Sequence, residues 1–65
     1  MNEKLLEAGM TEAEVAAFNL VCDAATAVLA LPDLHPMDRE EYCHAFHVIQ
    51  NKVLSRPLVR IVRTE

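Results

Sequence analysis

The residues that could do chemistry gather in the second half of the chain. One polar set shares a helical face at steps of four, three, four and four residues: Glu40, His44, His47, Asn51 and Ser55. Beside it, Glu41 and His44 form a Glu-x-x-His pair, a spacing that lets a carboxylate and an imidazole converge on one metal ion in a helical bundle. A metal site shared across a dimer would need further carboxylates, and Glu14 and Asp23 are the available donors.

A simpler interpretation is that these polar groups form only the solvated back of an amphipathic helix. We favour this interpretation because the Glu-x-x-His motif is short. Glu41, His44 and His47 are therefore candidate ligands, but we predict no metal and no other cofactor.

The two cysteines, Cys22 and Cys43, raise the alternatives of a redox pair or of zinc ligation, in which Cys43 and His47 would be the nearest i, i+4 pair. No C-x-x-C motif is present. A chain that folds back near Leu34 leaves the two sulfurs offset along the helix axis, which does not suit a disulfide. We expect two buried, inert thiols. The three histidines, clustered within residues 35–47, do not make a catalytic triad, so we expect no enzyme.

Charge is divided unevenly along the chain. Residues 1–33 hold six acidic and one basic side chain, whereas residues 52–65 hold four basic side chains and one acidic one. Such a basic end could contact the phosphates of nucleic acid or of a nucleotide, or an acidic protein surface. The net charge of −4 and the lack of aromatic residues among the arginines argue against nucleic acid. We predict that this end binds a partner through Arg56, Leu58, Arg60, Ile61 and Arg63.

Two helices must position these groups, and the first has the clearest local signal. Thr11 and Glu14 have the spacing of a capping box, and Met10 and Val15 flank it like a hydrophobic staple. Apolar residues then recur at helical spacing until Pro32, which cannot continue a helix. We predict a helix over residues 11–31.

The second helix is predicted over residues 38–55. Asp38 suits the N-cap, although Pro36 at the first helical position is an equally good start. Pro57 is expected to end the helix because the residue before a proline avoids the α conformation. The short connection over residues 32–36, with two prolines, predicts an antiparallel hairpin.

Both ends of the chain lie outside these two helices. Residues 3–8 could form a short helix, with Gly9 as its left-handed C-cap. Residues 57–65 are β-branched and basic, which favours an extended arm or a short edge strand. At 65 residues, the whole chain makes one domain, with residues 1–9 and 57–65 as its terminal segments.

Composition excludes two broad classes of protein. With 52% hydrophobic residues and one glycine, the chain does not resemble a disordered segment. It has no apolar stretch approaching the roughly 20 residues of a transmembrane helix, so we expect no membrane partner. The N-terminal residues lack the features of a signal peptide, and we therefore expect a cytoplasmic protein.

The first helix has more apolar surface than a single partner helix can cover. Pairing two hairpins into a four-helix bundle would bury that surface, and a different protein could do the same. We predict an all-α fold in which the hairpin forms a homodimer or higher oligomer. The expected core consists of Phe18, Cys22, Leu29, Phe46, Ile49 and Val53.

The second half of the chain also resembles a known group of proteins. The resemblance lies in the run Leu34-His35-Pro36-Met37-Asp38-Arg39-Glu40-Glu41, then His44, His47, Ile49-Gln50-Asn51 and Ser55-Arg56-Pro57-Leu58-Val59-Arg60. These residues are similar to those of small uncharacterised helical proteins of bacteriophages and prophages of Gram-negative bacteria. The resemblance implies an accessory protein that binds and blocks a host component, and it transfers no catalytic residue.

These observations lead to two hypotheses of different classes. The first is a small non-enzymatic protein–protein interaction module, an inhibitor or adaptor of phage type. The alternative is an oligomer that holds a metal ion or a nucleotide between its subunits.

Overall fold

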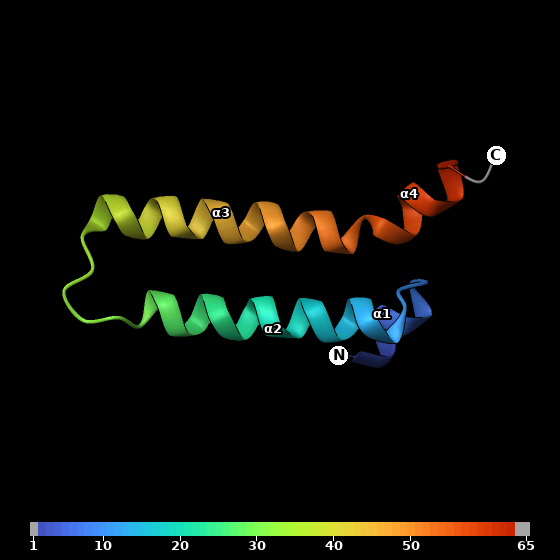
Figure 1. Cartoon of the computed structure of the whole chain (residues 1–65), viewed down its shortest axis with the longest axis horizontal. Helices are drawn as coiled ribbons and strands as arrows, with labels where there is room; N and C mark the ends of the chain where they lie inside the picture. The colour runs from blue at the N-terminus through green and yellow to red at the C-terminus, as the bar shows by residue number, and fades with distance from the viewer. Residues whose placement is uncertain (1, 64–65) are drawn as a thin grey trace.

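The computed structural model describes residues 2–63, and of Arg63 only the backbone. Four helices make up this part of the chain: α1 (Asn2–Glu7), α2 (Glu12–Leu29), α3 (Pro36–Leu54) and α4 (Arg56–Arg63). The helices α2 and α3 lie side by side and antiparallel, joined by a loop at one end (Figure 1). The all-α class and the antiparallel hairpin predicted from the sequence are thereby confirmed.

The capping box at the start of α2 is formed as predicted. The Thr11 hydroxyl accepts a hydrogen bond from the Glu14 amide at 3.1 Å, and the Glu14 carboxylate accepts one from the Thr11 amide at 2.8 Å. The helix ends at Leu29 with Ala30 as its C-cap, slightly before the predicted end at residue 31. The difference follows from Pro32, which disfavours the α conformation at the residue before it.

The second long helix starts at Pro36, the earlier of the two starts that the sequence allowed. His35 is the N-cap, and its Nδ1 atom accepts a hydrogen bond from the Met37 amide at 3.1 Å. Asp38 therefore lies in the first turn, where its charge meets the positive end of the helix dipole. Arg39 closes the hairpin by donating to the Leu29 carbonyl at 2.8 Å.

The prediction of an extended arm or strand over residues 57–65 is wrong for its described part, because α4 is a helix. Ser55 separates α3 from α4 but keeps near-helical dihedral angles, φ −86° and ψ −6°. Pro57 lies in the first turn of α4, where its missing amide proton is tolerated. The backbone hydrogen bond from Val59 to Ser55, at 3.0 Å, then carries the chain into α4. Residues 64 and 65 lie outside the described part.

The short N-terminal helix and its glycine cap are confirmed. Gly9 has φ +96°, a conformation that residues with a side chain rarely adopt. Its amide donates to the Leu6 carbonyl at 3.0 Å, and the Met10 amide donates to the Leu5 carbonyl at 3.2 Å. These two bonds form a Schellman motif, which turns the chain sharply from α1 into α2.

The apolar core is smaller than predicted and lies in a different place. Only Met10 and Val15 are buried apolar residues in the described part of the chain, at 4% and 5% exposure. They lie at the open end of the hairpin, near the start of α2. The predicted core residues along the hairpin are only half-buried, with one exception, Ile49, which is 44% exposed.

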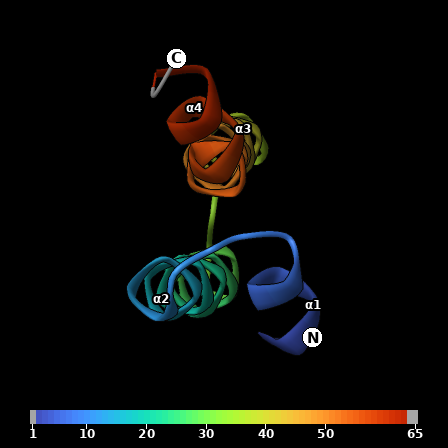
Figure 2. The ribbon, with the colours of Figure 1, turned by 90° about the vertical axis from the view of Figure 1, so that its right-hand side faces the viewer.

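The reason for this small core is the shape of the chain. Its principal extents are 47 × 22 × 14 Å, and the shortest is little more than the 10–12 Å diameter of one helix with its side chains. Figure 2 shows α2 and α3 one above the other, with α1 beside α2 on one flank only. A single layer of two long helices covers one stripe on each helix, so the broad face away from α1 is left in contact with solvent.

Candidate functional site

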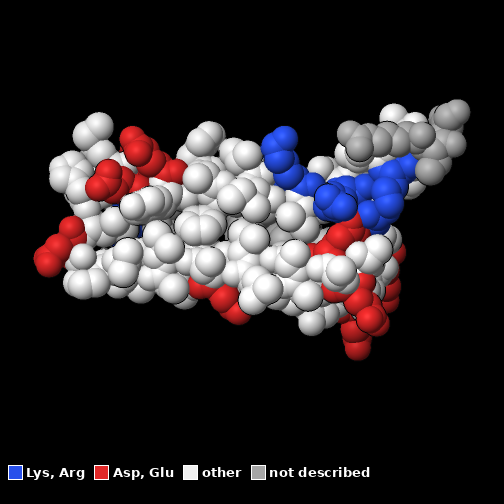
Figure 3. All heavy atoms as spheres, in the orientation of Figure 1, with Lys and Arg blue, Asp and Glu red and all other residues white. Residues whose placement is uncertain are grey.

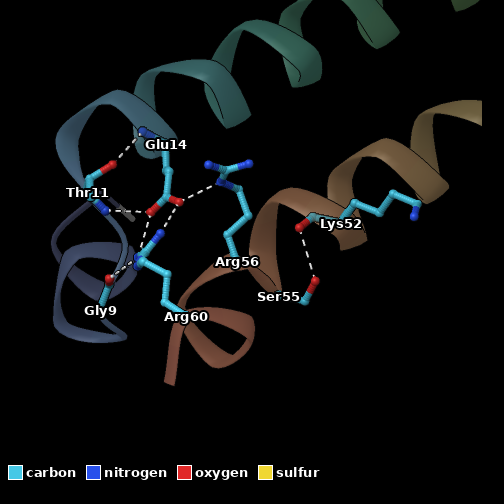
Figure 4. A network of polar contacts seen from close by, with 7 residues as sticks. All are labelled: Gly9, Thr11, Glu14, Lys52, Ser55, Arg56 and Arg60. Carbon is cyan, nitrogen blue, oxygen red and sulfur yellow. Dashed lines mark hydrogen bonds and ion pairs between the residues drawn. The ribbon is translucent and has the colours of Figure 1, made fainter. Parts of the chain in front are cut away.

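A cluster of polar side chains joins the two ends of the chain, with Glu14 at its centre (Figure 4). Glu14 is only 7% exposed, because it lies in the first turn of α2 beneath α4. Arg56 donates from Nε to Glu14 Oε2 at 2.7 Å. Arg60, one turn further along α4, donates from Nη1 to Oε2 and from Nη2 to Oε1, the latter at 2.9 Å.

This cluster also holds the linker between α1 and α2. Arg60 Nη2 donates to the Gly9 carbonyl at 2.8 Å, so one guanidinium reaches both Glu14 and the glycine cap of α1. Both carboxylate oxygens of Glu14 are occupied by donors. We call these three residues, Glu14, Arg56 and Arg60, the clamp. It fixes α4 against the beginning of α2.

The same hydrogen bonds control the charge states in the clamp. Donation from Arg60, from the Thr11 amide and from Arg56 holds the pKa of the Glu14 carboxyl far below its ordinary value of 4.5. The hydrogen bond with Glu14 raises the pKa of Arg60 in turn. Glu14 is therefore an anion near neutral pH, where it has no proton to exchange.

The structure separates the predicted partner-binding residues into two groups. Arg56 and Arg60 belong to the clamp, although their side chains are still 64% and 42% exposed. Leu58 and Ile61 are 64% and 62% exposed and lie on α4. The side chain of Arg63 lies outside the described part of the chain. The binding role of these residues remains a prediction.

The candidate metal ligands do not come together. Glu41, His44 and His47 are exposed on α3, and Glu14, one of the two possible further donors, is held by the clamp. Within residues 2–62, no group of three or more His, Cys, Asp or Glu side chains could hold a metal ion.

The two cysteines are free thiols, as expected, but the prediction that they are buried is wrong, because both are only half-buried between α2 and α3. Cys22 Sγ lies 3.5 Å from Gln50 Nε2, a contact that bridges α2 and α3. Among the described helices, none is both long and apolar enough to cross a membrane.

One broad face of the hairpin is largely apolar. On α2, helix α1 lies against the flank that carries Glu12, Ala16 and Asn19, and the Asn19 side chain donates to that of Asn2 at 3.0 Å. The opposite flank of α2 faces away from α1. On the same side of the hairpin lies the flank of α3 that leads to Arg56, whose side chain reaches Glu14. We call the surface formed by these two flanks the open face. Helical spacing places seven residues on this open face: Ala17, Val21, Ala24, Val28, Tyr42, Ala45 and Ile49.

Exposure and charge distinguish the open face from the rest of the surface. Val21 and Val28 are half-buried, Tyr42 and Ile49 are 41% and 44% exposed, and the three alanines are exposed. None of the seven is charged. Figure 3 looks onto the side away from α1, and its acidic and basic side chains gather at the ends and along the edges, leaving the middle without charge.

The clamp is not predicted from the sequence, although the sequence holds a signal for α4, the helix that carries both of its arginines. Glu14 was assigned only to the capping box and to a possible metal site. The spacing of Arg56, Arg60 and Arg63, at steps of four and three residues, is that of one helical face. This periodicity predicts a helix over residues 56–63, whereas the rule that Pro57 ends a helix predicts none there.

Comparison with protein-family models, with curated proteins and with solved structures finds no match to this chain. The resemblance to phage proteins remains a hypothesis.

Proposed function

We propose that this protein is a non-enzymatic interaction module that pairs with a second copy of itself through the open face. The observation that carries the proposal is the single-layer architecture: among the described apolar residues, only Met10 and Val15 are buried. A two-helix hairpin of this kind lacks an enclosed core, whereas two hairpins packed face to face enclose one.

The energy available from pairing is substantial. Burying apolar surface contributes about 25 cal/mol per Å², and fully burying one Val, Ile or Leu side chain contributes about 1.5–3 kcal/mol. Val21, Val28, Tyr42 and Ile49 would each lose their remaining exposure on pairing. In a two-fold dimer every such contribution occurs twice, so the open face can supply several kcal/mol, comparable with the whole stability of a small domain.

The arrangement of charges around the open face favours an antiparallel pair. On α3, steps of four and three residues continue beyond the open face at both of its ends: Asp38 precedes Tyr42, and Lys52 and Arg56 follow Ile49. The acidic residue lies at the loop end, and the basic residues lie at the open end. A two-fold axis perpendicular to the helices would place Asp38 of one copy near Lys52 and Arg56 of the other, so attraction would support the apolar contact.

The melting temperature tests this proposal because pairing couples folding to protein concentration. If the folded chain is stabilised by a second copy, the midpoint of thermal unfolding should rise with concentration between micromolar and millimolar values. A midpoint that stays constant over this range, with a cooperative transition, would contradict the proposal.

A further inference from the structure

A hollow on the surface lies over the junction between α3 and α4, beside the clamp. Its volume is about 330 Å³, and it is lined by Lys52, Ser55, Arg56, Val59 and Arg60. Three of these five residues are cations. They share one side of the chain because Ser55 keeps near-helical dihedral angles, so the helical spacing of α3 continues into α4 with little interruption.

The clamp leaves part of this positive charge without a counterion. Glu14 supplies one negative charge, and each of its oxygens already accepts two hydrogen bonds: Oε1 from the Thr11 amide and Arg60, and Oε2 from Arg56 and Arg60. Lys52, Arg56 and Arg60 together carry three positive charges. Among the described residues, an excess of two positive charges therefore lies at the hollow.

Arg56 presents the donors best suited to an anion. It donates to Glu14 through Nε, and its two terminal nitrogens have no hydrogen-bond acceptor among the described residues. In Figure 4 a dashed line joins Nε of Arg56 to the Glu14 carboxylate, and no dashed line reaches either terminal nitrogen. A guanidinium fixed in this way loses little conformational entropy when its fork of donors meets a phosphate group.

Lys52 and Ser55 complete the surroundings of the hollow. Lys52 extends along α3 in Figure 4, and its flexible four-carbon stem allows the ammonium group to move towards a bound anion. The Ser55 hydroxyl donates to the Lys52 carbonyl at 3.0 Å, so it lies at the base of the lysine side chain. Val59, which is 38% exposed, supplies an apolar wall.

The geometry points to a binding site for a phosphate monoester dianion in this hollow. Such a group carries a charge of about −1.5 to −2 at pH 7 and three acceptor oxygens, which match the two excess positive charges and the unused donors. All five lining residues belong to one chain, so the site does not require pairing through the open face. In the proposed pair, Asp38 of the second copy would compete with phosphate for Lys52 and Arg56.

The test is a titration of the full-length protein with inorganic phosphate, followed by ¹H–¹⁵N NMR at constant ionic strength set with sodium chloride. We expect the chemical shifts of the amides of residues 52–60 and of the Arg56 Nε–H group to change with phosphate concentration and to reach saturation. Lys52→Gln should weaken binding about fivefold or more, because it removes one of the three cations. Lys4→Gln is the matched control, because Lys4 is the other lysine of the chain and lies exposed on α1.

A second arm identifies the source of the phosphate group. Glycerol 3-phosphate represents a small soluble ligand, and phosphatidylcholine vesicles containing phosphatidic acid represent a lipid headgroup. If Lys52→Gln weakens the binding of one of these probes and Lys4→Gln does not, the result supports the site. The probe that binds then shows whether the phosphate group comes from a soluble ligand or from a lipid.

Three results would overturn the inference. They are chemical-shift changes that do not saturate, chemical-shift changes distributed over all basic residues, and an equal loss of phosphate affinity in the two lysine variants. Circular dichroism of both variants should match that of the parent protein, because both lysines are exposed. The variant Ile49→Gln, designed to weaken pairing, should bind phosphate at least as tightly as the parent does, because in the proposed pair Asp38 of the second copy competes for Lys52 and Arg56. Phosphate binding by this variant separates a failure of this site from a failure of the proposed pairing.

Discussion

Replacement of Ile49 by glutamine tests the open face with little risk to the hairpin itself. Ile49 is 44% exposed in the single chain, and glutamine is of similar length and is a good helix former. Fully burying an isoleucine contributes about 1.5–3 kcal/mol, so covering the exposed 44% contributes about 1 kcal/mol. Because the residue occurs twice in a two-fold dimer, the substitution should weaken pairing by about 2 kcal/mol, or about 30-fold in the dissociation constant.

The matched control is Leu54→Gln. Leu54 lies on the same helix, has the same number of side-chain carbons and is 41% exposed, but helical spacing places it on the opposite flank of α3. The dimer dissociation constants of the parent and both variants should be measured by sedimentation velocity over a range of concentrations. Ile49→Gln should dissociate about 30-fold more readily, and Leu54→Gln should behave like the parent. The reverse order would show that we have assigned the wrong face.

Three further predictions concern the fold. Val15→Ala removes two methyl groups from a residue that is 5% exposed, and it should lower the free energy of unfolding by about 2 kcal/mol in chemical denaturation. Gly9→Ala places a side chain at φ +96° and should lower this free energy by about 1–2 kcal/mol, measured in the same way. Because the pKa of Glu14 is lower in the folded chain than in the unfolded one, the unfolded chain binds more protons in acid. The contribution of Glu14 to the free energy of unfolding should therefore be complete above pH 4.5 and decline as the pH falls below this value. The difference in this free energy between the parent and Glu14→Gln should shrink in acid, as measured by denaturation followed by circular dichroism.

The parts of the fold that could be predicted from the sequence are those set by neighbouring residues. Thr11 and Glu14 specify the start of α2 through bonds three residues apart, and Gly9 ends α1 through its own backbone conformation. The start of α3 was ambiguous because Pro36 and Asp38 both suit the first turn of a helix, and local rules do not rank them.

The features that were missed depend on residues far apart in the sequence. Glu14 and Arg60 are separated by 46 positions, and nothing near either one shows that they meet. The same limit applies to burial: Ile49 has the helical periodicity of a core residue, but neither α1 nor α4 covers it, and it is 44% exposed. Periodicity identifies an apolar flank but not the surface that covers it, because that surface comes from distant residues or from another chain.

Sedimentation equilibrium of the full-length protein at micromolar concentration tests the central claim most directly, because it measures the mass of the particle in solution without a label or a substitution. A mass of at least twice the 7.3 kDa of one chain is the result expected from pairing through the open face. A single species of 7.3 kDa that still unfolds cooperatively would contradict the account, because the single layer of helices would then be stable without a partner.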